Sequence, residues 1–321
     1  MIASLTPLAD ALLRASLDGL LFCGIAFGLS RLLQRLPLAC VWLWRLALLK
    51  FVLGLLGVGV ALGPVPGASG TSGASASSSP WLYCILGGLA VGALLGAERL
   101  VRELRFLYKL HKDSQPAPEE WERAMPVSRF VRLRTSATIP SPLATGVFWP
   151  TIYLPTDLEL SAADRERVLA HELAHIRHGD LWFGWLVFLL ETVLFFHPGF
   201  WLARRELRLA QEMAADRAVS GAYSEYARLL LSLSCAKPGA TTALGISEGF
   251  QTLQKRLETL STPRRPADAL WLTIAAIFAL GLGTLTMAPR RAPAASVRTR
   301  TPAAAAAVFA PAAMAEPVVI R

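Results

Sequence analysis

The chain has 321 residues, of which 54% are hydrophobic, and its mean hydropathy is +0.45. This composition is too apolar for an ordinary soluble enzyme, so we expect membrane-spanning segments. The formal net charge is +9, but the arginines flank apolar runs and accompany no nucleic-acid-binding motif. We therefore expect membrane lipids with anionic headgroups as partners, and no direct binding of nucleic acid.

Apolar stretches that could serve as transmembrane helices occur four times, at residues 8–29, 38–62, 81–97 and 268–287. The loops after the first and third stretches are basic, whereas the loop after the second has no charged residue. The positive-inside rule then places the segment after residue 97 in the cytoplasm, in a multi-pass protein of the inner membrane. Against this orientation, the Ala- and Pro-rich tail at 288–321, which we expect to be disordered, carries several arginines.

The segment Val168–Asp180 contains the pattern H-E-x-x-H, within the letters VLAHELAHIRHGD. On a helix, His171 and His175 lie on one face about one turn apart, a spacing that suits two imidazole nitrogens on one Zn²⁺ ion. Glu172 is then the general base, which takes a proton from the metal-bound water. The pattern predicts a zinc metalloendopeptidase. The alternative is an amphipathic helix that carries two histidines and no metal.

A zinc protease site needs a third protein ligand. We favour Glu212, because Asp216 follows four residues later on the same helix face and could hydrogen-bond a ligand histidine. Other candidates for the third ligand are Glu191, His178, His197 and Asp180. Candidates for an extra donor to the oxyanion are Tyr223, Tyr226 and Arg217.

Residues 98–267 are the polar stretch large enough for a catalytic domain. Alternation predicts a strand at 130–134, and turn residues frame a second strand at 151–154, alongside which an extended substrate could add. Ser161 with Asp164 forms a capping box that would start the metal-binding helix, and Gly179 would end it. The apolar run 181–201 is expected to be buried or to dip into the membrane, because a full span would separate the two halves of the zinc site.

The whole pattern resembles the integral-membrane metallopeptidases of the beta-lactam-sensing antirepressor type (BlaR/MecR), over about residues 1–290. The resemblance rests on three apolar spans, then SPLATGVFWPTIYLP, HELAHIRHGD, FFHPGFW and EMAAD, then a last span. It implies a mainly α membrane protein with four transmembrane helices and an inserted α+β, gluzincin-like domain on the cytoplasmic side. It also implies that His171, His175 and Glu212 bind Zn²⁺ and that Glu172 is the base.

We therefore expect a regulatory endopeptidase that cleaves a cytoplasmic transcriptional repressor or a membrane protein. Only residues 288–321 follow the last predicted span, so we expect no penicillin-binding sensor domain and no direct beta-lactam sensing. Two alternatives stay open, namely a zinc-binding signalling scaffold that cleaves nothing and a housekeeping membrane metalloprotease. A homodimer also stays open.

Overall fold

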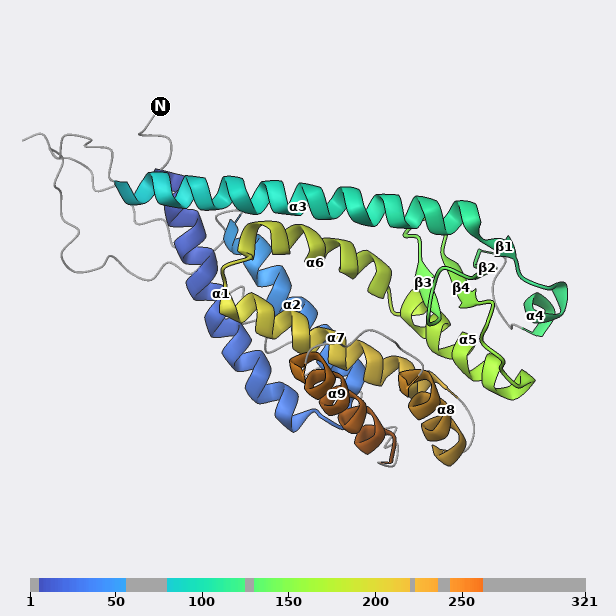
Figure 1. Cartoon of the computed structure of the whole chain (residues 1–321). Helices are drawn as coiled ribbons and strands as arrows, with labels where there is room; N and C mark the ends of the chain where they lie inside the picture. Colours follow the sequence, from blue (N-terminus) through green and yellow to red (C-terminus); the bar gives the residue numbers. More distant parts are fainter. Residues whose placement is uncertain (1–5, 56–79, 125–129, 220–222, 236–242, 262–321) are drawn as a thin grey trace, which may run out of the picture. The chain divides into compact units, whose positions relative to one another are not determined.

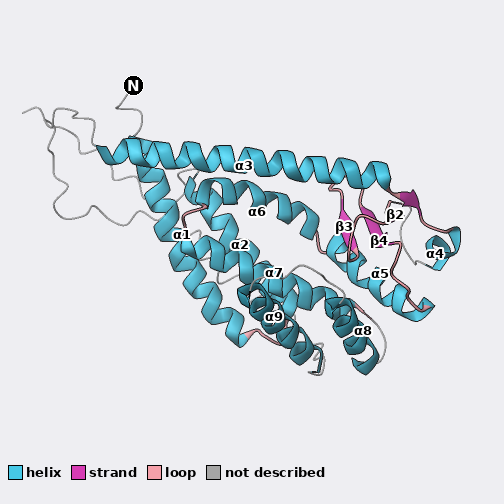
Figure 2. Cartoon of the chain, viewed as in Figure 1, coloured by secondary structure: helices cyan, strands magenta, loops and turns pink. Residues whose placement is uncertain are grey.

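The computed structural model describes residues 6–55, 80–124, 130–219, 223–235 and 243–261. The helices in these ranges are α1 (Thr6–Leu32), α2 (Pro37–Leu55), α3 (Pro80–Asp113), α4 (Glu119–Ala124), α5 (Ala162–Arg177), α6 (Asp180–Leu194), α7 (Pro198–Ala218), α8 (Tyr223–Cys235) and α9 (Ala243–Ser261). The strands are β1 (Gln115–Pro116), β2 (Arg132–Ser136), β3 (Leu143–Thr145) and β4 (Thr151–Pro155). The chain is thus mostly helical with one small sheet (Figure 2).

The prediction of a membrane fold with four transmembrane helices is wrong for the described part of the chain. No helix there combines the length and the apolar character that crossing a membrane requires. The apolar residues of α1 and α2 build a protein core instead, in which Trp44, Leu48 and Phe51 are fully buried. The third predicted span is only the first half of α3, which continues through the basic segment to Asp113. The fourth predicted span and the tail lie outside the described residues.

The first hydrophobic core joins α1 and α2 to α6 and α7 (Figure 1). On α7, the small side chain of Ala203 and the larger Phe200 and Leu207 are all buried in this core. The helix starts at Pro198, whose fixed backbone angle suits a first helical position. Before it, His197 caps the helix, because its Nδ1 accepts the backbone N–H of Phe200 at 3.1 Å. This core extends along α7 to Ala210 and Ala214, on either side of Glu212, and therefore fixes the part of the helix that carries Glu212.

The sheet has the strand order β1-β2-β4-β3. β2 and β4 are parallel, and β1 and β3 pair antiparallel on the outer sides. The predicted strands are confirmed, the first with a shift to Arg132–Ser136. β3 was not predicted, because its three residues lie between turn-forming neighbours and show no alternation. All five residues of β4 are buried, and a second core packs the sheet against α5, α8 and α9.

The two ends of α5 match the predicted start and end of the helix that carries His171 and His175. The Ser161 side chain accepts the backbone N–H of Asp164 at 3.1 Å, which confirms the capping box. Gly179 has φ of +73° between the two helices, a backbone conformation that favours glycine. The apolar run that follows is divided between α6 and α7, and α6 packs against α3, α2 and α7. Its other face leaves Trp182 and Leu189 exposed.

Candidate metal centre

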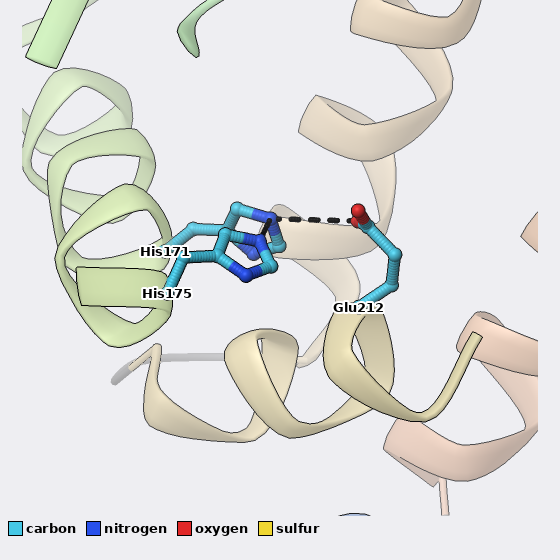
Figure 3. A group of neighbouring side chains, drawn as sticks. All are labelled: His171, His175 and Glu212. Atoms are coloured by element: carbon cyan, nitrogen blue, oxygen red, sulfur yellow. Dashed lines mark hydrogen bonds and ion pairs between the residues drawn. The ribbon is translucent and has the colours of Figure 1, made fainter. Parts of the chain in front are cut away.

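Three side chains from two helices converge on one point (Figure 3). His171 and His175 project from α5 one turn apart, and Glu212 projects from α7. The Nε2 atoms of the two histidines are 3.3 Å apart, and His171 Nε2 is 3.6 Å from Glu212 Oε2. One potential ligand atom from each residue lies within 4.8 Å of the others.

These distances fit a tetrahedral Zn²⁺ ion. Two ligands bound at about 2.0–2.1 Å and separated by a tetrahedral angle lie roughly 3.3–3.4 Å apart. The distances of 3.3 Å and 3.6 Å agree with that value without any movement of α5 relative to α7. Two imidazoles and one carboxylate also leave the fourth position free, as in catalytic zinc sites. The structure thus places the three predicted ligands together.

A separate carboxylate supports each histidine through its other ring nitrogen. Asp216 Oδ1 lies 3.1 Å from His171 Nδ1, and Asp180 Oδ2 lies 2.7 Å from His175 Nδ1. An Nδ1–H that donates to a carboxylate fixes the tautomer and turns Nε2 toward the metal position. The predicted hydrogen bond between a histidine of the site and Asp216 is present, with Asp216 as the acceptor. Asp180, considered as a third ligand, instead supports His175.

Arg256 of α9 completes the acidic side of the site. Its guanidinium binds Asp216 through two hydrogen bonds, from Nε to Oδ2 and from Nη2 to Oδ1, both 2.7 Å long. Its Nη1 lies 3.0 Å from Glu212 Oε2. Tyr226 of α8 donates its hydroxyl to Asp216 Oδ1 at 2.7 Å and also lies 3.1 Å from His171 Nδ1. Two carboxylates can therefore lie side by side, because Arg256 neutralises part of their charge.

The charges of this network shift the pKa values of its members. Burial lowers the pKa of His171, but hydrogen bonds to Asp216 and Glu212 outweigh burial and raise the pKa to about 9. Burial raises the pKa of Asp216, yet the hydrogen bonds from Arg256 and His171 leave it below its usual value. The pKa of Glu212 is likewise held well below its usual range, by His171 and Arg256. Both carboxylates are thus kept ionised, as metal binding and its support require.

A cavity of about 290 Å³ opens onto the three ligand side chains. Glu172 lines this cavity, next to His171 in the sequence and on the same helix. Ser141–Ala144, which include the first two residues of β3, and Leu181 of α6 also line the cavity. A substrate in the cavity would therefore contact Glu172, the ligand side chains and the start of β3.

The remaining candidates from the sequence have other positions. Glu191 pairs with Arg204 at 3.0 Å and with Arg99, and His197 caps α7. His178 ends α5. Of the candidate oxyanion donors, only Tyr226 lines the cavity. Tyr223 donates its hydroxyl to Leu257 O, and Arg217 donates to Thr259 O.

Sequence reasoning missed Arg256 and the pairing of Asp180 with His175. Arg256 lies 40 residues beyond Asp216, on the separate helix α9, so no local spacing related the two. Asp180 follows His175 by five residues across a helix end, so no helical spacing related the two. The nearest signal was the run HGD, which placed an acidic residue immediately after a predicted helix end.

Comparison with known proteins gives two findings. Residues 79–260 match the family described as BlaR1 peptidase M56. The chain is also similar to Regulatory protein BlaR1 of Bacillus licheniformis, with 29% identity over 164 residues. That alignment covers 48% of this chain and 27% of the length of the relative. The three candidate ligands, Glu172 and Arg256 all lie inside the region that matches the family.

Proposed function

We propose that this chain, which belongs to the BlaR1 peptidase M56 family of metallopeptidases, is a zinc-dependent endopeptidase with a regulatory role. The observation that carries the proposal is the convergence of His171, His175 and Glu212 at distances suited to one Zn²⁺ ion. The carboxylate on each histidine adds support, since metal-binding histidines in proteins are oriented in this way.

Zinc in this position would supply Lewis-acid chemistry, which polarises a peptide carbonyl and makes water nucleophilic near neutral pH. Glu172 is the general base: it removes the proton from the attacking water and returns the proton to the leaving amine. Asp216 and Asp180 keep the histidine rings in place during these steps. The hydroxyl of Tyr226 and the guanidinium of Arg256 are the cavity-lining donors on the acidic side.

The substrate would bind as an extended chain along β3. The prediction that it would add alongside 151–154 is wrong, because β4 is paired on both sides, to β2 and to β3. β3 is the last strand in the order, and its Leu143 and Ala144 line the cavity next to the ligands. An edge strand offers backbone groups that an extended peptide can pair with. A cleaved peptide whose backbone is N-methylated beside the scissile bond should then have a lower kcat/KM.

We further propose that the substrate is a protein with a regulatory role, such as a cytoplasmic transcriptional repressor, and that the protein works at the inner membrane. The name of the relative, a regulatory protein, supports the first part. Exposed apolar side chains on α1 and α3 support membrane association, including Leu20, Leu21, Leu94 and Leu95. The basic residues that follow on α3 would suit anionic headgroups.

The experiment that tests the proposed function compares three purified proteins: wild type, His171→Ala and Glu172→Gln. We expect the wild type to bind one equivalent of zinc and the Glu172→Gln variant to bind zinc but lose at least a hundredfold in peptide cleavage. The His171→Ala variant should lose both. Absence of zinc from the wild type would refute the metal site, whereas full activity of Glu172→Gln would refute the assigned base.

In cells, the fragment pattern of the wild type and that of Glu172→Gln should differ in a few proteins if the role is regulatory. Accumulation of many different uncleaved proteins in the variant would instead indicate a housekeeping protease. An unchanged cellular phenotype in Glu172→Gln would favour the signalling scaffold.

A further inference from the structure

The support of His175 extends beyond the peptidase part of the chain into α2. Asp180 uses Oδ2 for His175 Nδ1, while its Oδ1 accepts from Arg45 Nη2 at 2.6 Å and from Gln211 Nε2 at 2.8 Å. Arg45 lies in the middle of α2, outside the residues 79–260 that match the peptidase family. The chain of contacts from Arg45 through Asp180 to His175 therefore links the N-terminal helices to the metal position.

Arg45 is surrounded by hydrogen-bond acceptors and aromatic rings, and its hydrogen bonds reach both the end of α5 and the start of α6. Its Nη1 donates to the carbonyl oxygen of His178 at 2.9 Å, at the end of α5, while its Nη2 binds Asp180, the first residue of α6. The rings of Phe183 and Trp42 lie 4.8 Å and 5.1 Å from its guanidinium carbon. Arg45 is only 4% exposed and Asp180 8% exposed, so solvent screens this ion pair weakly.

We propose that Arg45 is a positioning residue for the metal centre. Through Arg45, the α1–α2 hairpin helps to orient a metal ligand of the peptidase. The proposal rests on the proposed function, because it assumes that His175 is a metal ligand. Arg45 holds the Asp180 carboxylate in the orientation in which Oδ2 faces His175 Nδ1. Asp180 in turn keeps the Nε2 of His175 directed toward Glu212 and His171. Only an arginine supplies two donors with this fork geometry.

A different role for Arg45 has to be separated from this one. Arg45 could simply stabilise the packing of α2 on α6 without any effect on the metal ligands. The two roles differ in one measurable respect. A positioning residue changes the affinity and the coordination geometry of the metal in a folded protein, whereas a packing residue changes only the stability.

The experiment uses the purified full chain loaded with Zn²⁺ or Co²⁺. Arg45→Met should lower Zn²⁺ affinity about ten- to a hundredfold, as is usual for the loss of a residue that supports a metal ligand. The visible absorption spectrum of bound Co²⁺, which reports ligand geometry, should change as well. Arg45→Lys keeps the charge but not the fork, so its affinity should lie between those of Arg45→Met and the wild type.

Lys50→Met is the matched control. Lys50 is another buried cation of α2, only 2% exposed, and it lies over the ring of Phe22 at 5.3 Å from the ring centre. Its replacement also removes a buried positive charge from α2. Zn²⁺ affinity and the Co²⁺ spectrum of folded Lys50→Met should match those of the wild type.

A double-mutant comparison shows whether Arg45 acts through Asp180. In an Asp180→Asn background, the additional change Arg45→Met should leave Zn²⁺ affinity unchanged, because the carboxylate that Arg45 orients is already absent. If Arg45→Met alone does not fold, Asp180→Asn and the double variant can still be compared, because the double variant has no unpaired carboxylate at position 180. A further loss of affinity in the double variant would overturn the proposal, as would a wild-type Co²⁺ spectrum in folded Arg45→Met. If the wild type itself bound no metal, the proposed function would fail instead.

Discussion

At the scale of single residues, the two ligand histidines have the same kind of support. Each gives its Nδ1 to a buried aspartate, and each aspartate is bound by an arginine from a distant part of the chain. The first series is His171, Asp216, Arg256, and the second is His175, Asp180, Arg45. The arginines differ in one respect, because Arg256 also lies 3.0 Å from Glu212. Removing Arg256 therefore affects two carboxylates instead of one.

Replacing Arg256 with methionine should lower the free energy of unfolding of the metal-free protein by about 3–5 kcal/mol, because buried Asp216 loses its counter-charge. The loss should be smaller with saturating Zn²⁺, since the ion supplies positive charge beside Glu212. Urea denaturation with and without zinc measures both values. The control Arg228→Met, at an exposed position on α8, should stay within about 0.5 kcal/mol of the wild type. An equal loss in both variants would contradict the role of Arg256.

At the scale of elements, the turn at Gly179 sets the distance between His175 and Asp180. α5 ends at Arg177 and α6 begins at Asp180, so the turn brings an aspartate back to the last turn of the helix that precedes it. The positive φ of Gly179 makes this tight reversal possible. Apart from its chain neighbours, no atom of the described residues lies within 4 Å of the position that a Cβ would occupy there, so backbone conformation is what limits substitution.

Replacing Gly179 with alanine should lower the free energy of unfolding by about 1–2 kcal/mol, which is the cost of the left-handed conformation for an L-residue. Gly184 is the matched control: it lies within α6, is exposed, and also has open space around its would-be Cβ. Gly184→Ala should raise the free energy of unfolding by about 0.5–1 kcal/mol, because alanine favours a helix. Thermal or urea denaturation would show the opposite signs. A stabilising Gly179→Ala would contradict the account of the turn.

At the scale of the whole molecule, α7 connects two hydrophobic cores: its own side chains pack in the first core, and Val219, directly after it, packs in the second. One core holds the α1–α2 hairpin against α6 and against α7 as far as Ala214, and the other holds the sheet against α5, α8 and α9. The second half of α7 brings Glu212 and Asp216 to α5. Apolar side chains that neither core uses lie exposed on α1, α2 and α3. Under the proposed function, this surface would contact a membrane.

Anionic lipid vesicles should carry the full chain with them in a flotation gradient, because exposed apolar groups and nearby arginines both favour the bilayer surface. Leu94→Glu, which places a charge on the exposed apolar face of α3, should lower the fraction that floats. Thr156→Glu introduces the same charge at an exposed site beyond β4 and should leave that fraction unchanged. Equal flotation of all three proteins, or flotation of none, would argue against the assigned surface.

The two helices that carry the candidate ligands, α5 and α7, could be predicted from the sequence. The spacing of His171 and His175 and the spacing of Glu212 and Asp216 are both local, and helical periodicity alone puts each pair on one face. The start of α5 at Ser161 and its end near Gly179 depend on backbone capping within a few residues. The two predicted strands followed from the alternation at 130–134 and from the turn residues that frame 151–154. The roles of the site residues stay predictions until metal binding is measured.

The transmembrane assignment failed because hydropathy cannot distinguish a helix buried in lipid from a helix buried in a protein core. Trp44, Leu48 and Phe51 could face lipid or a protein core, and their contacts with α1 and α7 decide for the core. β3 and the edge position it occupies depend on pairing with a strand six residues further on. Local patterns carry no information about that pairing.

The sequence by itself determined which side chains are the candidates for the site: two histidines, a glutamate as base and a second glutamate as third ligand, each in a local pattern that a helix converts into geometry. Only the tertiary structure decided what supports them. Arg45 lies 135 residues before Asp180, and Arg256 lies 40 residues after Asp216. Burial makes both ion pairs strong and specific, but burial is a property of the packed molecule and of no segment alone. For that reason the candidate ligands could be predicted from the sequence, while the arginines that bind the supporting carboxylates could not.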